Sequence, residues 1–330
     1  MDAREIGPAR RRRMAAAFAA VALLAAPGAR AEEAFITEQP ANAVAVVDLA
    51  AVTARAAAVK AQIAVPGQPA GIAVTRDGTR AYVTSPDDKM VTAIDAASRT
   101  VLARWPVGGG PLGIAVAPSG TPVFVADWYA KRLVVLDPQQ PERLREAPTG
   151  TSPSGVAVTP DGAFVLTADR DDDTVSVIDA ARLERVAVIP VGTRPFGVTI
   201  DAEGRRAYTA NVGSNDVSVI DLDRRAVVAS VKVGERPYGV ALARGLAFVT
   251  NQYGGSVSVF DVGTLADRGR ITVGDYPEGI AASGDGSRVY VANWFDNSLS
   301  VIDTAALKVV ATVPLGEGPR AFGAFIRSTP

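Results

Sequence analysis

The stretch PFGVTIDAEGRRAYTANVGSNDVSVIDLDRRAVVASVKVG, residues 195–234, holds four short segments rich in β-branched residues. "PFGVTI", "RRAYTAN", "DVSVID" and "VVASVKVG" each have the length and alternation of a strand. "DAEG", between the first two, reads as a tight hairpin turn. The stretch therefore predicts four antiparallel strands within 40 residues.

The same pattern recurs along the whole chain. Glycine stands two residues after each of the first six members of a proline series, and an aspartate ends each predicted third strand. Repeats of four strands in roughly 40 residues are typical of β-propeller blades. Seven prolines, spaced by 42, 42, 42, 42, 40 and 42 residues, mark the repeat: Pro69, Pro111, Pro153, Pro195, Pro237, Pro277 and Pro319.

The two ends of the chain complete one repeat between them. "AFITEQPANAVAVVDL", from residue 34, matches the second and third strands, whereas "PRAFGAFI", from residue 319, matches a first strand. One blade would therefore take strand one from the C-terminus and strands two to four from the N-terminus, which removes two open sheet edges. We expect an all-β, seven-bladed propeller with four antiparallel strands per blade, spanning residues 32–330 as one domain.

The predicted second strands carry a further motif: "FITE" at 35, "YVTS" at 82, "FVAD" at 124, "LTAD" at 166, "YTAN" at 208, "FVTN" at 248 and "YVAN" at 290. On these segments the chain resembles the YVTN-type β-propeller family over residues 34–326. The resemblance implies an exported bacterial or archaeal propeller. Some such proteins are linked to quinone-cofactor alcohol oxidation or to haem-binding propellers of nitrite reduction.

Composition excludes several chemistries. The chain has no cysteine and no histidine. Disulfides, thiol catalysis, Ser-His-Asp catalysis and nearly all haem, zinc and copper ligation are therefore ruled out. We predict no cofactor, no haem, no metal site and no catalytic residue. "DRDDDTV", residues 169–175, spaces carboxylates as a calcium loop does, but it lacks the glycine and the final glutamate of an EF-hand.

The first 31 residues predict a signal peptide. Arg10–Arg13 precede an apolar run, and Ala29-Arg30-Ala31 has the form of a cleavage site. Cleavage after Ala31 leaves 28 basic and 33 acidic residues, so the exported protein would be mildly acidic. We expect a periplasmic or secreted protein that does not span the membrane after cleavage, and nucleic acid is an improbable partner.

Two sets of repeated polar residues predict structural roles. The aspartates that end the third strands are expected to accept hydrogen bonds from turn amides. The polar residues that end the second strands are expected to cap turns in the same way: Glu38, Ser85, Asp127, Asp169, Asn211, Asn251 and Asn293.

The loops differ between the two faces of the expected disc. One face, here called the rim face, carries the loops that enter the first strands and the turns that join second to third strands. Eight of the chain's 20 aromatic residues lie in these loops, and none lies in the opposite turns such as "TPDG" and "DAEG". Aromatic residues and arginine often carry binding energy at interfaces. The candidate ligand-binding residues are Trp128, Tyr129, Arg194, Phe196, Arg236, Tyr238, Tyr253, Tyr276, Glu278, Trp294, Phe295 and Arg320.

The rim predicts a binding or scaffold protein that recognises an envelope protein or a peptide, with a small molecule as another possible ligand. An enzyme or enzyme accessory is the alternative. It would be a metal-dependent lactonase-like hydrolase or a component of quinone-cofactor-dependent alcohol oxidation. Binding of single-stranded nucleic acid on the aromatics is a third alternative.

Overall fold

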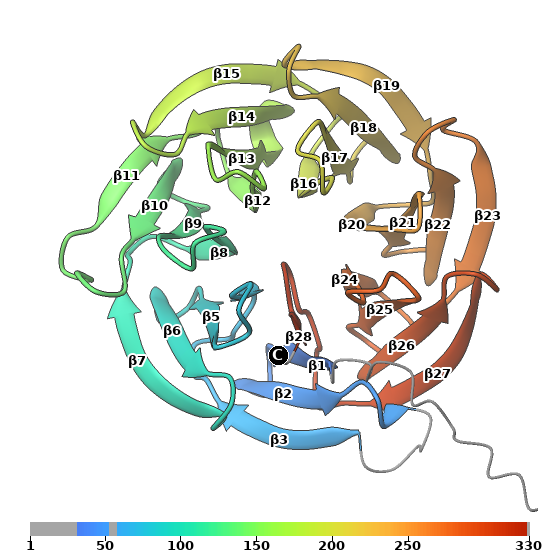
Figure 1. The fold of residues 1–330 in the computed structure, drawn as a ribbon, viewed down its shortest axis with the longest axis horizontal. Helices are drawn as coiled ribbons and strands as arrows, with labels where there is room; N and C mark the ends of the chain where they lie inside the picture. Colours follow the sequence, from blue (N-terminus) through green and yellow to red (C-terminus); the bar gives the residue numbers. More distant parts are fainter. Residues whose placement is uncertain (1–31, 53–57, 329–330) are drawn as a thin grey trace, which may run out of the picture.

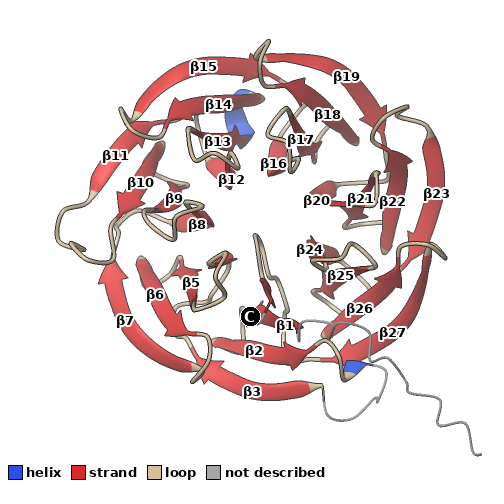
Figure 2. Ribbon diagram, viewed as in Figure 1, coloured by secondary structure: helices blue, strands red, loops and turns tan. Residues whose placement is uncertain are grey.

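The computed structural model describes residues 32–52 and 58–328. In these residues 28 strands form seven four-stranded antiparallel sheets around one axis (Figure 1). Figure 2 shows that strands make up nearly all of the regular structure. The 3₁₀ turn Arg170–Asp172 joins β13 to β14. The predicted seven-bladed propeller is confirmed. The predicted signal peptide, residues 1–31, lies outside the described residues.

The first blades in chain order use these strands: β1 (Glu32–Glu38), β2 (Ala43–Asp48) and β3 (Val59–Ala64); β4 (Ile72–Val74), β5 (Arg80–Ser85), β6 (Met90–Asp95) and β7 (Thr100–Pro106); β8 (Pro111–Val116), β9 (Val123–Asp127), β10 (Arg132–Leu136) and β11 (Arg145–Pro148); β12 (Pro153–Val158), β13 (Phe164–Asp169), β14 (Thr174–Asp179) and β15 (Glu184–Pro190). The remaining strands are β16 (Pro195–Ile200), β17 (Arg206–Asn211), β18 (Asp216–Asp221) and β19 (Ala226–Lys232); β20 (Pro237–Ala243), β21 (Leu246–Asn251), β22 (Ser256–Asp261) and β23 (Asp267–Thr272); β24 (Pro277–Ala282), β25 (Arg288–Asn293), β26 (Ser298–Asp303) and β27 (Lys308–Pro314); and β28 (Ile326–Ser328).

The closing blade joins both ends of the chain, with strand order β28-β1-β2-β3 (Figure 1). Its regular pairing is short, running from Ala34↔Ile326 to Glu32↔Ser328. The preceding segment bonds to both neighbours. Phe35 N on β1 donates to Phe325 O at 2.9 Å, and Ile72 N in the next blade donates to Phe322 O at 2.9 Å. The last inner strand is thus less regular than the expected "PRAFGAFI" strand, and it binds two blades together.

Inner strands approach one another closely at the repeated glycines. A Cβ placed on Gly113 would lie 1.9 Å from Ser154 O, and one on Gly155 would lie 2.5 Å from Phe196 O. Each glycine therefore faces the main chain of the next blade, where a side chain would force the blades apart. The core lies between blades, where side chains from neighbouring second and third strands interdigitate.

The repeated polar residues hold turns in place. Each third-strand aspartate accepts main-chain N–H bonds from the turn that follows, as Asp303 does from Ala305 and Ala306. Asn251 is fully buried at the end of β21. Its Oδ1 accepts from Gly234 N at 3.0 Å, in the loop that leads into β20, the first strand of the same blade. Most of these residues therefore serve the fold, as the sequence predicted. Ser85 is the exception, because its buried hydroxyl has no hydrogen-bond partner among the described residues. No described helix is long and apolar enough to cross a membrane.

Candidate functional site

The two predicted loop types meet on one face of the disc. Val212 N donates to Arg194 O at 2.9 Å, and Trp294 N donates to Tyr276 O at 3.0 Å. Each bond links the turn after a second strand to the loop before the first strand of the same blade. The rim face is therefore a set of paired loops, each tied to its own blade.

In several of these loops, the residue before the repeated proline has a left-handed backbone conformation. Arg194, Arg236 and Tyr276 have φ of 55°, 51° and 56°. Such a conformation is disfavoured for non-glycine residues and needs support from its surroundings. The Asn215 side chain supplies it at Arg236, where its Oδ1 accepts the main-chain N–H at 2.9 Å. Preceding blades thus fix the direction of these side chains.

Four of the predicted site residues lie together at the channel mouth: Phe196, Tyr238, Glu278 and Arg320. Two of them are aromatic residues that plug it. Phe196 and Tyr238 are 6% and 4% exposed, and their rings stack at 4.1 Å. Phe322 from the closing strand lies 5.0 Å from Phe196 and 5.6 Å from Tyr238, measured between ring centroids. These three rings form one buried cluster with Val212, against which Leu112 and Trp128 pack. We call Phe196, Tyr238 and Phe322 the plug.

A buried ion pair lies beside the plug. Glu278 Oε2 is 3.0 Å from Arg320 Nε, and Gln252 Nε2 donates to Glu278 Oε1 at 2.8 Å. Arg320 also donates to the Tyr238 hydroxyl at 2.6 Å. Burial raises the pKa of Glu278, and the charge on Arg320 opposes that rise. Burial likewise raises the pKa of Tyr238. The two charges balance each other at ion-pair distance without a hydrogen bond between Glu278 Oε2 and Arg320 Nε. Arg320 ties the pair to the plug through the Tyr238 hydroxyl.

A second group of predicted residues forms an exposed aromatic patch. Tyr253 and Phe295 are 60% and 62% exposed, and Tyr276 lies between them. The Tyr276 ring centroid is 5.9 Å from that of Tyr253 and 4.8 Å from that of Phe295. The Arg236 guanidinium lies 4.5 Å from the Tyr253 ring centroid. We call Arg236, Tyr253, Tyr276 and Phe295 the aromatic patch.

The other predicted residues flank these two groups. Trp128 is half-buried with Arg170 over its ring at 5.6 Å, and Trp294 is half-buried under Arg320 at the same distance. Tyr129 is 78% exposed, and Arg194 is exposed on the loop before β16. The sequence pattern located the face, but it did not separate buried from exposed aromatics.

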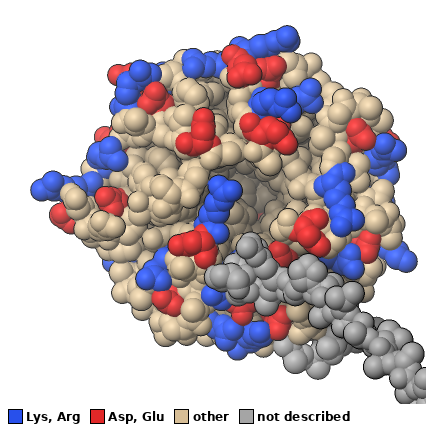
Figure 3. Space-filling model, viewed as in Figure 1, with Lys and Arg blue, Asp and Glu red and all other residues tan. Residues whose placement is uncertain are grey.

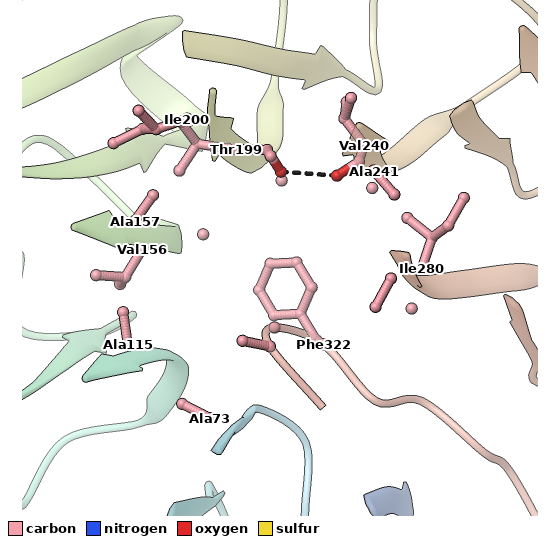
Figure 4. Close-up of a pocket in the computed structure, with 18 of the residues that line it drawn as sticks. Ala73, Ala115, Val156, Ala157, Thr199, Ile200, Val240, Ala241, Ile280 and Phe322 are labelled. Carbon is pink, nitrogen blue, oxygen red and sulfur yellow. Dashed lines mark hydrogen bonds between the residues drawn. The ribbon is translucent and has the colours of Figure 1, made fainter. Parts of the chain in front are cut away.

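The central channel contains a cavity of about 380 Å³. Figure 4 shows that the innermost strands of several blades line it and that Phe322 projects into its centre. Sequence reasoning did not identify this lining. A sequence pattern that could have identified the lining is the residue two places after each repeated glycine. This residue is small in most blades: Ala73, Ala115, Ala157, Ala241 and Ala281, with Thr199 as the exception.

Acidic residues in the described part of the chain do not form a metal centre. No group of three His, Cys, Asp or Glu residues able to hold a metal occurs there. In the 169–175 loop, Asp172 Oδ2 accepts from Thr151 N at 2.7 Å, and Asp173 Oδ1 accepts from Arg194 N at 2.7 Å. These carboxylates cap main-chain groups.

The comparisons with known proteins agree with this architecture. A family model described as "Lactonase, 7-bladed beta-propeller" matches residues 133–235, less than a third of the chain. No curated protein matches the sequence. Hydrazine synthase from Kuenenia stuttgartiensis superposes with a TM-score of 0.70 at 22% identity, covering 78% of this chain and 89% of that one.

A second solved structure is similar over nearly its whole length. It is described as a functionally unknown protein from Desulfotomaculum acetoxidans DSM 771. It has a TM-score of 0.74 at 17% identity, and the match covers 88% of this chain and 99% of that one. At such identities the likeness to both structures shows the fold alone. The matches support a seven-bladed propeller with a lactonase-like central segment.

Proposed function

We propose that this protein is an exported binding protein that recognises a protein or peptide partner through the aromatic patch of its rim face. The observation that carries the proposal is the exposure of Tyr253 and Phe295 beside Tyr276. Adjoining, solvent-facing aromatic side chains are unusual on a surface that binds nothing. Tyrosine and arginine are also the side chains that most often dominate binding energy.

The patch is ordered before any partner binds. Tyr253 contacts Tyr276 on one side and Arg236 on the other, so fewer rotamers remain to be lost on binding. When less conformational entropy is lost on binding, affinity is higher for the same contact area. The rest of the predicted site would extend or support the contact: Trp128, Tyr129, Arg194, Phe196, Tyr238, Glu278, Trp294 and Arg320.

Export is part of the proposal and is supported by the sequence. The arginine run and apolar segment before Ala31 are typical of a secretory signal. A periplasmic or secreted partner would then bind the rim face. We expect neither nucleic acid nor haem as a ligand of this protein.

A site-specific crosslinking experiment tests the proposal. A photoreactive phenylalanine analogue at position 295 should capture one discrete partner in the native envelope. The same analogue at Leu102, which is 50% exposed on the outer strand β7, serves as the control. Purified partner should then bind the wild-type protein and lose at least tenfold in affinity on Tyr253→Ala. Equal crosslinking at 295 and 102, or unchanged affinity, would reject the patch.

The partial family match favours one second candidate, a lactonase-like hydrolase. Its support is the model match over residues 133–235. Against it, Glu278 is the one charged side chain that lines the channel cavity, and it is paired with Arg320. Turnover of a lactone panel by the purified protein, with and without added divalent cations, would establish this activity. No hydrolysis in either condition would reject the hydrolase candidate.

A further inference from the structure

The geometry points to a second binding site in the central channel, for one small, uncharged and mainly apolar molecule. This inference is independent of the proposed function, because it concerns the channel interior and not the aromatic patch. The cavity of about 380 Å³ falls within the range of roughly 300–1,000 Å³ found for small-molecule pockets.

The cavity is blind at the rim face. The plug residues Phe196, Tyr238 and Phe322 are each under 8% exposed and contact one another there. The lining reaches Pro118, in the turn between β8 and β9 on the opposite face. Figure 3 shows a hollow at the centre of one face of the disc. A molecule would therefore enter from the face of the β8–β9 turn and stop against Phe322.

The lining chemistry selects the ligand. Apart from Glu278 and Thr199, the side chains that line the cavity are aliphatic, proline or phenylalanine, with glycine between them. Glu278 is engaged by Arg320 and Gln252. The Thr199 hydroxyl donates to Val240 O at 2.7 Å (Figure 4). An anion would lose its hydration without gaining a partner, and for a cation the charge of Glu278 is already balanced by Arg320. The cavity therefore disfavours charged ligands such as phosphates, carboxylates and sulfonates.

Hydrogen-bonding capacity comes from the main chain. Most innermost strands have a sheet neighbour on their outer side alone, as β16 has β17. The exception is β4, because Ile72 N and Val74 N donate to Phe322 O and Ala324 O. Main-chain groups on the channel side of such an edge strand are open to a ligand. A hydrophobic molecule with one hydroxyl, carbonyl or amide fits this combination. A sugar lactone, whose several hydroxyls need several polar side chains, does not.

The space exists because the inner residues are small. Ala157 on β12 and Ala241 on β20 line the cavity from different blades. Replacing either with phenylalanine adds a ring to the empty volume. At Ala157, which is partly exposed, the added ring enters existing space, so the fold should survive and the ligand should be excluded. Ala241 is 5% exposed and also packs in the core between blades, so its variant is checked for folding first.

A matched pair of fluorescent probes tests the inference on the purified full chain. N-phenyl-1-naphthylamine is neutral, and 8-anilinonaphthalene-1-sulfonate has similar rings with a sulfonate. We expect saturable one-to-one binding of the neutral probe and at least tenfold weaker binding of the anion. Ala241→Phe should weaken neutral-probe binding at least tenfold, whereas Phe295→Ala, in the aromatic patch, should leave it unchanged.

Three outcomes would overturn the inference. They are no saturable binding of the neutral probe, equal binding of the two probes, and unchanged binding by a folded Ala241→Phe variant. If Ala241→Phe does not fold, two milder variants replace it. Ala157→Val and Ala281→Val each add a smaller side chain to the cavity, from two other blades. Both variants should weaken binding at least threefold, and unchanged binding in both would also reject the channel site.

Discussion

At the scale of single residues, the inner glycines set how closely the blades approach. The backbone of Gly113 does not need a left-handed conformation, so its requirement is purely one of space. A methyl group there would lie 1.9 Å from Ser154 O, and neither main chain can move without shifting a whole blade. An added methyl group should therefore destabilise the fold more between the inner strands than in the cavity beside them.

Gly113→Ala should lower the free energy of unfolding by at least about 2 kcal/mol, because overpacking against the main chain has no cheap relaxation. Gly263→Ala is the matched control. A Cβ on Gly263 would meet its nearest neighbour, Asp261 Oδ1, at an ordinary 3.4 Å. The control should change stability by less than about 0.5 kcal/mol. Urea unfolding of both variants measures the difference, and similar losses would contradict the steric explanation.

Residues at equivalent repeat positions also explain what the sequence could and could not predict. Phe196 and Tyr238 stand between proline and glycine, where the strand directs a side chain toward the channel axis, and both are buried. Phe295 lies in a turn that has no such direction, and it is exposed. The repeat located all three on the rim face. Their burial depends on neighbouring blades, which the local sequence does not specify.

At the scale of elements, each blade buries one polar residue at the end of its second strand, and in most blades that residue ties strands and loops together. Asn251 Nδ2 donates to the hydroxyls of Ser256 and Ser258 at 3.1 and 3.0 Å, and its Oδ1 accepts from Gly234 N. One side chain thus joins β21, β22 and the loop that leads into β20. The equivalent residues in two other blades are aspartates, Asp127 and Asp169.

Asn251→Leu should lower the free energy of unfolding by about 1–3 kcal/mol, because it leaves buried hydrogen-bonding groups without partners. Asn251→Asp should cost less, since the carboxylate still accepts from Gly234 N and the two serine hydroxyls can turn to donate. Thermal unfolding of both variants at neutral pH tests the order. A larger loss in Asn251→Asp than in Asn251→Leu would mean that burial of charge outweighs the hydrogen bonds.

At the scale of the whole molecule, the ring closes through side chains as well as strands. Glu33 on β1 is 5% exposed and accepts from Arg327 Nη1 on β28 at 2.6 Å. Its other oxygen accepts from Arg99 Nη2, in the next blade, at 2.7 Å. The proline and glycine repeats predicted that the two chain ends share a blade. They could not predict this ion pair, because Glu33, Arg99 and Arg327 are not repeat positions.

The Glu33 interaction should make closure of the ring sensitive to acid. Burial alone would raise the pKa of Glu33, but hydrogen bonds from Arg327 and Arg99 outweigh it and lower the pKa below its ordinary value of 4.5. A carboxyl whose pKa is lower in the folded state stabilises the fold above its unfolded pKa. That stability is lost as pH falls through the folded pKa.

Glu33→Gln should therefore reduce the free energy of unfolding by about 1–3 kcal/mol at pH 7. The difference from the wild type should shrink progressively below pH 4.5, because the wild-type carboxyl becomes protonated while the amide does not titrate. Glu142→Gln is the control, because the Glu142–Arg143 pair is 3.8 Å apart and mostly exposed. Urea unfolding from pH 7 to pH 3.5 measures both variants. A penalty for Glu33→Gln that is the same at every pH would show that shape, and not charge, makes Glu33 hold the two ends together.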